Sequence, residues 1–284
     1  MAKIIDGKAV SAAVKQQVAE ETKILKDKGV TPGLAVIIVG DDPASRVYVN
    51  NKKKACELVG FLSREYALPK ETTQAELLSL VKELNNDKKI NGILCQLPLP
   101  KHLDEKAVIE AIDPNKDVDA FHASNVGKIM IGDYDFLPCT PAGVMELIHS
   151  ENIDVKGKEC VVIGRSNIVG KPMAMLLLHE HGTVTVCHSR TTNLKEVCLR
   201  ADILVAAVGI PKFVKSDMVK EGAVVIDVGM DRDENGKLCG DVDFADVQEK
   251  CSYITPVPGG VGPMTIAMLM KNTLKAAKLQ NGIN

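Results

Sequence analysis

The chain has 284 residues, of which 45% are apolar and 25% are charged, and its formal net charge is −2. This length gives room for two domains with sizeable cores, and the composition is ordinary for a globular protein. The small net charge, without a basic tail or a basic patch interleaved with aromatic residues, argues against a protein that binds nucleic acid.

The eight cysteines are scattered along the chain without a C-x-x-C pair. Cys95, Cys160 and Cys187 lie in apolar segments, as free thiols do when they act as small hydrophobic residues in a reducing compartment. The start of the sequence lacks a signal-peptide pattern, and no apolar run reaches the roughly 18 residues of a membrane span. We therefore expect a cytoplasmic protein without disulfides, a metal site or a membrane partner.

The first part of the chain alternates between helical and strand patterns. Apolar residues recur with helical spacing over 7–28, and Gly29 follows as a stop signal. The next expected elements are a strand over 34–39, a helix from 41 to 59, a strand over 61–68, a helix over 73–84, a strand over 92–95 and a short helix over 104–112. This alternation predicts a parallel sheet with helices on its faces.

The pattern becomes a polar loop with Gly and Pro from 113 to 141, and we place a domain junction there. After a helix over 142–150, strands are expected at 160–163, 183–187, 203–208, 223–228 and 253–255, and Asn235-Gly236 predicts a hairpin. The last helix begins at Pro263 and is expected to pack back on the first domain. The predicted domains are 1–140 together with 263–284, and 141–262.

The segment 158–178 combines a buried strand, a turn from Gly164 to Gly170 and a helix start at Pro172. Such a turn directs backbone N–H groups and the positive end of a helix toward one point, which suits a phosphate. The spacing is not the usual G-x-G-x-x-G, so a plain strand-to-helix turn fits this segment alone equally well.

The strand over 183–187 ends at Ser189 and Arg190, where nucleotide-binding folds that prefer NAD carry an acidic residue. A hydroxyl and a guanidinium at that place, with Arg165 in the preceding turn, favour NADP because arginine binds phosphate oxygens well. The alternative is that Arg190 only caps a surface loop.

A second group of polar residues lies in the first domain. Ser45, Tyr48 and Lys52 share one face of the expected helix, where a phenol and an amine can orient a substrate and move a proton. The alternative is that Lys52 belongs, with Lys53 and Lys54, to a solvated basic patch.

Further candidates follow strands or lie in loops. Gln96 comes directly after the strand over 92–95, and Asp117 and Asp119 form a carboxylate pair without a third metal ligand. The alternatives are a Gln that satisfies loop backbone and an Asp117 that stabilises a turn. The segment 255–265, TPVPGGVGPMT, combines restricted prolines with glycines that leave backbone bare for a ligand.

Four segments in this order, YVNNKKKA, NGILCQLPLP, VIGRSNIVGKP and TPVPGGVGPMT, resemble the bifunctional methylenetetrahydrofolate dehydrogenase/methenyltetrahydrofolate cyclohydrolase family. The resemblance implies an α/β protein with an N-terminal αβα parallel-sheet catalytic domain and a C-terminal Rossmann-type domain that binds NADP. It further implies oxidation and hydrolysis of tetrahydrofolate derivatives in one-carbon metabolism and purine biosynthesis, and a homodimer paired through the Rossmann domains.

The resemblance also implies roles for individual residues. Lys52 would be the key catalytic residue of the cyclohydrolase step, Gln96 would tune its charge, Tyr48 would stack on the folate ring and Asp119 would bind the pterin edge. The implied folate-binding residues are Ser45, Tyr48, Lys52, Gln96, Leu97, Pro98, Asp119, Pro258, Gly259, Gly260 and Val261. The implied NADP-binding residues are Gly164, Arg165, Ser166, Val169, Gly170, Ser189, Arg190, Gly209, Met230 and Thr255.

One position departs from the family pattern. Ala120 stands where the family usually has glycine, and its methyl group is expected to affect the loop that aims Asp119. Two other functions remain open at this point: an NAD(P)-dependent dehydrogenase without the hydrolase step, and a non-catalytic module that senses a nucleotide.

Overall fold

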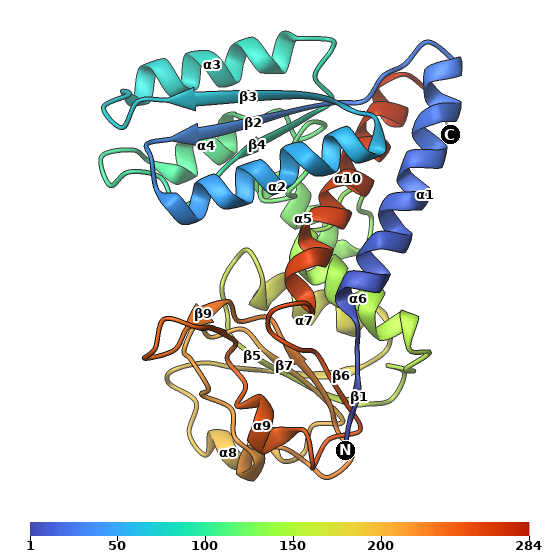
Figure 1. Cartoon of the computed structure of the whole chain (residues 1–284), viewed down its shortest axis with the longest axis vertical. Helices are drawn as coiled ribbons and strands as arrows, with labels where there is room; N and C mark the ends of the chain where they lie inside the picture. Colours follow the sequence, from blue (N-terminus) through green and yellow to red (C-terminus); the bar gives the residue numbers. More distant parts are fainter. Residues whose placement is uncertain (284) are drawn as a thin grey trace. The chain divides into compact units, whose positions relative to one another are not determined.

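Figure 1 shows a computed structural model of the protein, which describes residues 1–283. The chain divides into two compact units. We call Met1–Ser11 with Thr140–Thr265 the six-stranded unit, and Ala12–Cys139 with the chain from Ile266 onward the three-stranded unit, after their main sheets. The predicted α/β class is confirmed, because both sheets are parallel and carry helices between successive strands.

The three-stranded unit is built on a parallel sheet of order β3-β2-β4. β2 (Gly33–Val39) lies in the centre, between β3 (Leu62–Leu68) and β4 (Gly92–Cys95), and all its residues are buried. An unbroken apolar run suits such a strand, because both faces of the sheet are covered. The helices of this unit are α2 (Pro43–Val59), α3 (Gln74–Asn86), α4 (Glu105–Ala111) and α5 (Ala123–Ile131), with most of α1 (Gly7–Asp27) and α10 (Val261–Gln280).

The ends of α2 follow from local sequence. The carboxylate of Asp42 accepts the N–H of Ser45 at 2.8 Å, which caps the first turn next to Pro43. Gly60 ends the helix in the left-handed conformation with φ of 80°, which glycine adopts without steric cost. These two caps fix the register of α2, and with it the face that carries Ser45, Tyr48 and Lys52.

The six-stranded unit contains a parallel sheet of order β1-β11-β8-β7-β5-β6. Its strands are β1 (Lys3–Ile4), β5 (Glu159–Ile163), β6 (Thr183–Cys187), β7 (Ile203–Ala206), β8 (Val224–Asp227) and β11 (Tyr253–Ile254). Its helices are α6 (Cys139–Ser150), α7 (Gly170–His179), α8 (Leu194–Cys198), α9 (Phe244–Val247) and the short 3₁₀ helix η1 (Ser216–Met218). Apolar side chains from β5, β7, β8 and β11 form its core.

The strand order of this sheet reverses at β5. The chain passes from β5 to β6 on one side, and then crosses to β7 on the other side of β5. In open parallel sheets such a reversal leaves a crevice beyond the carboxyl ends of the adjacent strands, here β5 and β7. Ligands bind in this crevice. The loops after β5 and β7 are therefore the expected position of a nucleotide in this unit.

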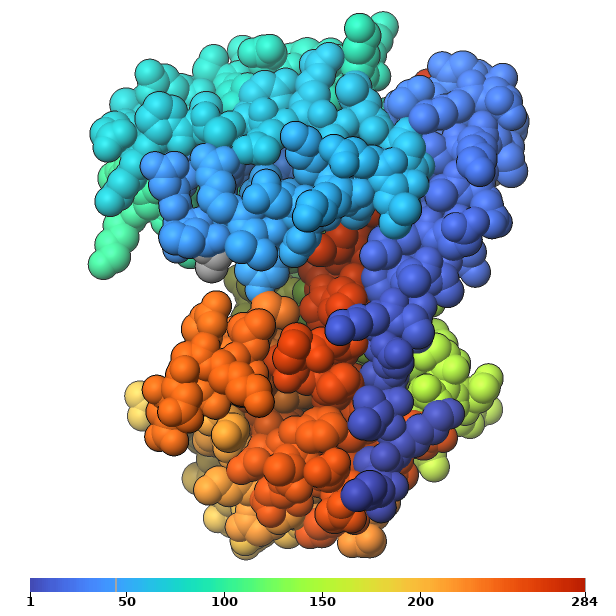
Figure 2. Space-filling view, in the orientation of Figure 1, coloured from blue at the N-terminus to red at the C-terminus, as the bar shows by residue number. Residues whose placement is uncertain are grey.

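The predicted hairpin at Asn235-Gly236 is confirmed. β9 (Asp231–Arg232) pairs antiparallel with β10 (Leu238–Cys239), and the loop between them is largely exposed. The hairpin belongs to the orange surface of the six-stranded unit in Figure 2.

The structure differs from the sequence-based prediction at several short elements. β1, α8, α9 and η1 were not predicted, and α5 lies in the segment taken as loop. β1 pairs with β11, so Met1–Ser11 are part of the six-stranded unit rather than of a first domain over 1–140. A strand of two residues has no periodicity, so only its partner reveals it.

The last helix agrees with the expected return of the chain. α10 begins at Val261, and from Ile266 onward it belongs to the three-stranded unit, as the fold prediction proposed. Asn284, the final residue of the predicted range 263–284, lies outside the described residues. Within residues 1–283 no helix combines the length and apolarity needed to cross a bilayer.

Candidate functional site

Lys52 is the most unusual ionisable residue of the three-stranded unit. Its side chain is only 8% exposed, whereas Lys53 and Lys54 beside it are exposed. Lysine is almost never this buried unless it has a partner. The interpretation of 52–54 as one solvated basic patch is therefore wrong for Lys52 and right for its two neighbours.

The partner of Lys52 is Gln96, which follows β4. The ammonium Nζ of Lys52 donates a hydrogen bond to Oε1 of Gln96 at 2.7 Å, and Nε2 of Gln96 donates to the carbonyl of Leu97 at 2.8 Å. The second bond fixes which end of the amide faces the lysine. Leu97, which precedes Pro98, thus orients Gln96, and Gln96 orients the amine.

The electrostatic surroundings of Lys52 make it able to exchange a proton. Burial lowers the pKa of Lys52, and the nearby Asp119, Cys139 and Cys95 oppose that shift. Burial also raises the pKa of the Asp119 carboxyl, with the charge of Lys52 acting against it. A buried amine beside a carboxyl is suited to general acid–base chemistry, since its pKa lies closer to neutrality than that of a free lysine.

The two other residues of this α2 face differ in exposure. Tyr48 is 37% exposed, and partial burial raises the pKa of its phenol. Ser45 is buried, and its backbone N–H is held by the helix cap at Asp42. An accessible ring next to a buried amine can hold a flat substrate against it.

Asp117 and Asp119 lie in different surroundings and have different contacts. Asp117 is buried and accepts hydrogen bonds from the N–H of His122 and from Nδ2 of Asn125, both at 2.8 Å. The alternative that Asp117 stabilises a turn is confirmed. Asp119 is only partly buried and is the carboxyl that interacts with Lys52.

The departure at Ala120 has a structural counterpart. Ala120 is fully buried and adopts φ of 56°, a left-handed conformation that costs an alanine about 1–2 kcal/mol. Its N–H nevertheless donates to the carbonyl of Asp117 at 3.1 Å, which closes the turn. Asp119 remains in electrostatic contact with Lys52, so the loop accommodates the methyl group.

Sequence reasoning missed the thiol neighbours of this cluster. Burial raises the pKa of Cys139 well above its usual value and that of Cys95 to about 12, so both are neutral thiols. Cys139 hydrogen-bonds to Asp119 and also lies 3.4 Å from the carbonyl of Val118. The position of Cys95 directly before Gln96 was the one signal in the sequence; Cys139 had none.

The six-stranded unit carries the other group of candidate residues, at the carboxyl end of β5. Gly164 has φ of 136°, and a Cβ there would lie 2.2 Å from the carbonyl of Ala207. A Cβ at Gly170 would lie 2.3 Å from the carbonyl of Gly164. Both positions require glycine because backbone packs against backbone, which brings the start of α7 close to the reversal of the sheet.

The turn between these glycines is closed by Ser166. Its Oγ accepts the N–H of Val169 at 3.2 Å and that of Gly170 at 3.3 Å, while Arg165 is exposed. After β6, Ser189 and Arg190 are also exposed, and the N–H of Arg190 donates to Nδ1 of His188 at 3.1 Å. These turns present two guanidinium groups at the carboxyl ends of β5 and β6, without an acidic residue at the end of β6.

The remaining predicted cofactor residues follow β7, β8 and β11. Gly209 has φ of 66°, and Met230, 43% exposed, extends toward Gly262, where an added Cβ would lie 2.7 Å from its Cε. Thr255 is 1% exposed, and its Oγ accepts the N–H of Asp227 at 2.7 Å. Thr255 thus also has a structural task, which sequence reasoning did not anticipate.

The glycine-rich loop after β11 packs tightly within its own unit. A Cβ at Gly260 would lie 2.6 Å from the carbonyl of Pro256, and one at Gly7 would lie 1.9 Å from the carbonyl of Gly260. Gly259 has φ of 110°, a conformation for glycine. The segment Pro258–Val261 is thus held by the first turn of α1 and leaves little room for side chains.

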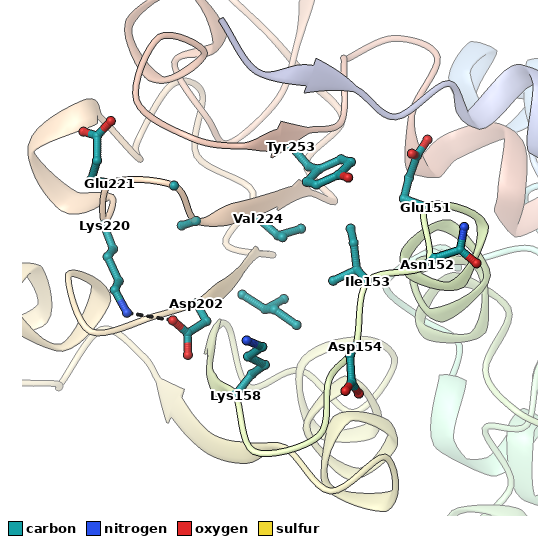
Figure 3. A pocket seen from close by; sticks show the side chains of 13 residues that line it. Glu151, Asn152, Ile153, Asp154, Lys158, Asp202, Lys220, Glu221, Val224 and Tyr253 are labelled. Carbon is teal, nitrogen blue, oxygen red and sulfur yellow. Dashed lines mark hydrogen bonds and ion pairs between the residues drawn. The ribbon is translucent and has the colours of Figure 1, made fainter.

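Two of the pockets formed by the described residues lie in the six-stranded unit. One, of about 320 Å³, is lined by Asp227, Gly240 and Pro256 among others, next to the glycine-rich loop. The other, of about 340 Å³, is shown in Figure 3, where Tyr253 and Ile153 point into it and Asp202 is hydrogen-bonded to Lys220. The second pocket lies at the amino ends of β7 and β8 and contains none of the predicted site residues. Among residues 1–283, no three or more His, Cys, Asp or Glu side chains are grouped to hold a metal ion.

A doubly wound sheet with a glycine-built turn at its reversal, in a chain that also buries a lysine in a second α/β unit, defines a nucleotide-dependent enzyme. Known proteins identify the family. Residues 5–119 match the tetrahydrofolate dehydrogenase/cyclohydrolase catalytic domain, and residues 138–281 match the NAD(P)-binding domain of the same family. The chain belongs to the tetrahydrofolate dehydrogenase/cyclohydrolase family.

Relatives and solved structures agree with this assignment. The chain is 67% identical over 279 residues to the bifunctional protein FolD of Acetivibrio thermocellus, and 98% of each chain is covered. It is similar to the crystal structure of the bifunctional FolD enzyme of Campylobacter jejuni, with a TM-score of 0.96, 52% identity, and 99% of this chain and 100% of that chain covered. The Trypanosoma brucei FolD enzyme, complexed with NADP cofactor and inhibitor, gives a TM-score of 0.95 at 41% identity, covering 99% of this chain and 98% of that chain.

These comparisons confirm the predicted resemblance and the predicted combination of a catalytic with an NAD(P)-binding domain. They give no support to a dehydrogenase that lacks the hydrolase step or to a module that only senses a nucleotide.

Proposed function

We propose that this chain oxidises 5,10-methylenetetrahydrofolate with NADP⁺ and hydrolyses the 5,10-methenyl product to 10-formyltetrahydrofolate, and that Lys52 moves the protons of the second reaction. The family supports both activities. The observation that carries the role of Lys52 is a buried amine with a lowered pKa, hydrogen-bonded to an oriented amide.

Hydrolysis of the methenyl cation needs proton transfer but no activation of the carbon, which is already electrophilic. The neutral amine of Lys52 accepts a proton from water as the water oxygen bonds to the methenyl carbon. The resulting ammonium is stabilised by Gln96 and Asp119 and returns a proton to N5 as the bond from N5 to that carbon breaks. The hydroxyl left on the carbon releases its own proton to solvent as the carbonyl forms, so one water is consumed, one proton is released and the formyl group remains on N10.

The oxidation asks less of the side chains, because NADP⁺, when bound, accepts the hydride from the methylene carbon. The protein has to hold the nucleotide. Gly164 and Gly170 would let the diphosphate approach bare backbone and the start of α7. Ser166 and Val169 shape this turn, and the exposed Arg165 would bind phosphate oxygens.

The residues at the other end of the nucleotide support a preference for NADP over NAD. Ser189 and Arg190 are exposed at the end of β6, where a ribose 2′-phosphate would lie, and a guanidinium binds phosphate with two parallel hydrogen bonds. Gly209, Met230 and Thr255, which follow β7, β8 and β11, are assigned to the nicotinamide half.

For the folate, Tyr48 supplies a flat, partly exposed surface and Asp119 a carboxyl for the N–H groups of the pterin. Ser45 precedes Lys52 on the same face of α2, and Leu97 and Pro98 directly follow Gln96; we assign all three to the folate site. The segment Pro258–Val261 contributes backbone groups, because its glycines leave that backbone uncovered.

We also propose a cytoplasmic homodimer that supplies one-carbon units to purine biosynthesis. The support for pairing is β6, which forms an edge of the six-stranded sheet and exposes 38% of Val186. Light scattering on the purified protein tests the dimer: a mass of one chain at all concentrations rejects it, and a mass of two that Val186→Lys reduces to one supports it.

The activity is tested by incubating purified protein with 5,10-methylenetetrahydrofolate and NADP⁺ while following both NADPH and 10-formyltetrahydrofolate. Equal production of the two supports the proposal. NADPH with accumulation of the methenyl compound indicates a dehydrogenase alone, and nucleotide binding without either product indicates a sensing module.

A further inference from the structure

Asn272 connects α10 to the two chain segments that carry Asp119 and Cys139, both neighbours of Lys52. It is 6% exposed, and its Nδ2 donates hydrogen bonds to the carbonyls of Val118 and Leu137, both at 2.8 Å. An amide nitrogen has two hydrogens, so this pair of bonds uses them both. Val118 directly precedes Asp119, and Leu137 lies shortly before Cys139.

The carbonyl of Val118 determines the direction in which Asp119 leaves the backbone. That oxygen belongs to the planar peptide unit between Val118 and Asp119, so fixing the oxygen fixes the orientation of the unit and the Cα of Asp119. Cys139 approaches the same oxygen at 3.4 Å, and Nδ2 of Asn272 lies 3.7 Å from the Cys139 sulfur. Asn272 therefore holds the Val118 carbonyl oxygen, to which the Cys139 thiol next to Asp119 also donates.

The remainder of this turn is fixed by other contacts. Asp117 is held by His122 and Asn125, and the N–H of Ala120 donates to the carbonyl of Asp117. These bonds close the turn around Asp119, but they do not involve the Val118 carbonyl. Since Ala120 is in a left-handed conformation, the turn has to hold its shape against a steric cost.

We propose that Asn272 is a positioning residue: by holding the Val118 carbonyl it keeps the Asp119 carboxyl within reach of Lys52. Its catalytic consequence rests on the proposed role of Lys52 in hydrolysis, whereas the coupling between the three residues does not. The ionisable groups that face Lys52 are Asp119, Cys139 and Cys95, and the two thiols are neutral, so Asp119 is the one whose charge matters.

The direction of the effect follows from the sign of the charge. Asp119 raises the pKa of Lys52 against the lowering effect of burial. If the Val118 peptide unit turns, Asp119 moves away, and the pKa of Lys52 falls further. A change that only loosens α10 would reduce stability without moving that pKa.

The same helix offers a matched control. Gln280 also donates from one amide nitrogen to two backbone carbonyls, those of Asn91 at 2.9 Å and Asn115 at 2.8 Å, but it does not contact the Val118–Cys139 region. Thr273, buried beside Asn272, bonds within the helix to the carbonyl of Leu269 and controls for burial. Gln280→Met and Thr273→Val therefore disturb α10 without releasing Asp119.

The experiment measures the pKa of Lys52 by NMR titration of protein labelled at the lysine Cε, with the resonance assigned by its loss in Lys52→Arg. We expect Asn272→Leu to lower this pKa, Gln280→Met and Thr273→Val to leave it unchanged, and Asn272→Leu to have no effect when Asp119→Asn is already present. Asn272→Ser, which removes the amide without adding apolar bulk, serves if the leucine variant does not fold.

Activity provides the second measurement. We expect Asn272→Leu to reduce kcat of hydrolysis about tenfold, because the ammonium that Lys52 forms during the reaction loses the stabilising charge of Asp119, with the KM for NADP⁺ unchanged. An unchanged Lys52 pKa in both Asn272 variants, a shift of the same size in Gln280→Met, or a shift that persists in the Asp119→Asn background overturns the proposal. A shifted pKa with unchanged hydrolysis keeps the coupling and rejects instead the catalytic role of Lys52.

Discussion

The two groups of candidate residues differ in what carries their chemistry. In the three-stranded unit the candidate residues act through their side chains: the buried Lys52 and the partly buried Gln96 and Asp119 change one another's pKa or orientation. In the six-stranded unit it falls to backbone, since Gly164 and Gly170 approach neighbouring carbonyls too closely for any Cβ. The difference matches the two reactions, because hydrolysis needs a proton carrier and hydride transfer needs a well-placed nucleotide.

The comparison predicts that the two activities can be separated by mutation. Changing an ionisable side chain in the three-stranded unit should affect hydrolysis first. Changing the charged loops of the six-stranded unit should affect nucleotide affinity first.

The largest effect is expected for Lys52→Ala, which removes the proposed proton carrier. Hydrolysis should fall by about 10² to 10⁴, the usual contribution of general acid–base catalysis, while part of the dehydrogenase activity remains. Steady-state rates of both reactions in one preparation measure the separation. Lys53→Ala, which removes the exposed neighbouring amine, should leave both rates unchanged. Full hydrolysis by the Lys52 variant would remove the basis of the comparison.

A buried carboxyl in the six-stranded unit tests whether shifted pKa values by themselves indicate catalysis. Asp227 is 3% exposed, and burial raises its pKa to about 7, although its carboxylate accepts N–H groups of Gly229, Asp241 and Val242. Because all three bonds are to backbone, we assign Asp227 to the fold. Its titration should then appear in stability and not in the rate of hydrolysis.

The sign follows from proton linkage. The folded protein holds this proton up to a pH of about 7, whereas the unfolded chain releases it near the ordinary aspartate pKa of 3.8, so stability falls as pH rises between those values. The loss amounts to at most about 4 kcal/mol, since each pKa unit is worth about 1.4 kcal/mol. Urea unfolding across this range should show the slope in the wild type and not in Asp227→Asn.

Asp202 provides a control of opposite sign. Its hydrogen bond with Lys220 lowers the pKa of Asp202, so its contribution is present at neutral pH and is lost as pH falls through the folded-state value. Asp202→Asn should therefore lower stability at neutral pH and remove the pH-dependent loss on the acid side, while the slope of stability up to a pH of about 7 stays as in the wild type. A slope that survives in Asp227→Asn would assign that titration to another group.

How far the sequence predicts these sites depends on the range of the interactions involved. The helix that carries Lys52 and the turn from Gly164 to Gly170 follow from local caps, glycines and periodicity, and both are where they were predicted. The burial of Lys52 was not predictable, because it depends on Gln96 and Asp119, which reach it through the fold. Asn272 had no sequence signal, since an asparagine in a helix is usually exposed or neutral in effect.

A smaller effect is expected at the nucleotide phosphate. Arg190→Ala should raise the KM for NADP⁺ about tenfold, as for the loss of one charged hydrogen bond, and leave the KM for NAD⁺ unchanged. Arg200→Ala removes another exposed guanidinium from the same unit and should change neither. An equal loss for both nucleotides would show that Arg190 does not read the 2′-phosphate and only caps its loop.

The smallest effect is expected for Ala120→Gly. This position joins the two parts of the comparison, because a strained backbone conformation lies directly beside Asp119, a proposed site side chain. Glycine removes the cost of the left-handed φ of 56°, about 1–2 kcal/mol, but loses about 0.5–1 kcal/mol of that gain to the greater freedom of the unfolded chain. The net stabilisation should lie between about 0 and about 1.5 kcal/mol in urea unfolding. Asn152→Gly, at φ of 54°, should gain less because asparagine tolerates this conformation. The kcat and KM of hydrolysis should stay unchanged in Ala120→Gly, because Asn272 and the Asp117 carbonyl already hold the loop. Faster hydrolysis in this variant would show that the methyl group of Ala120 keeps Asp119 from its best position. Backbone strain would then limit the site built from side chains as well.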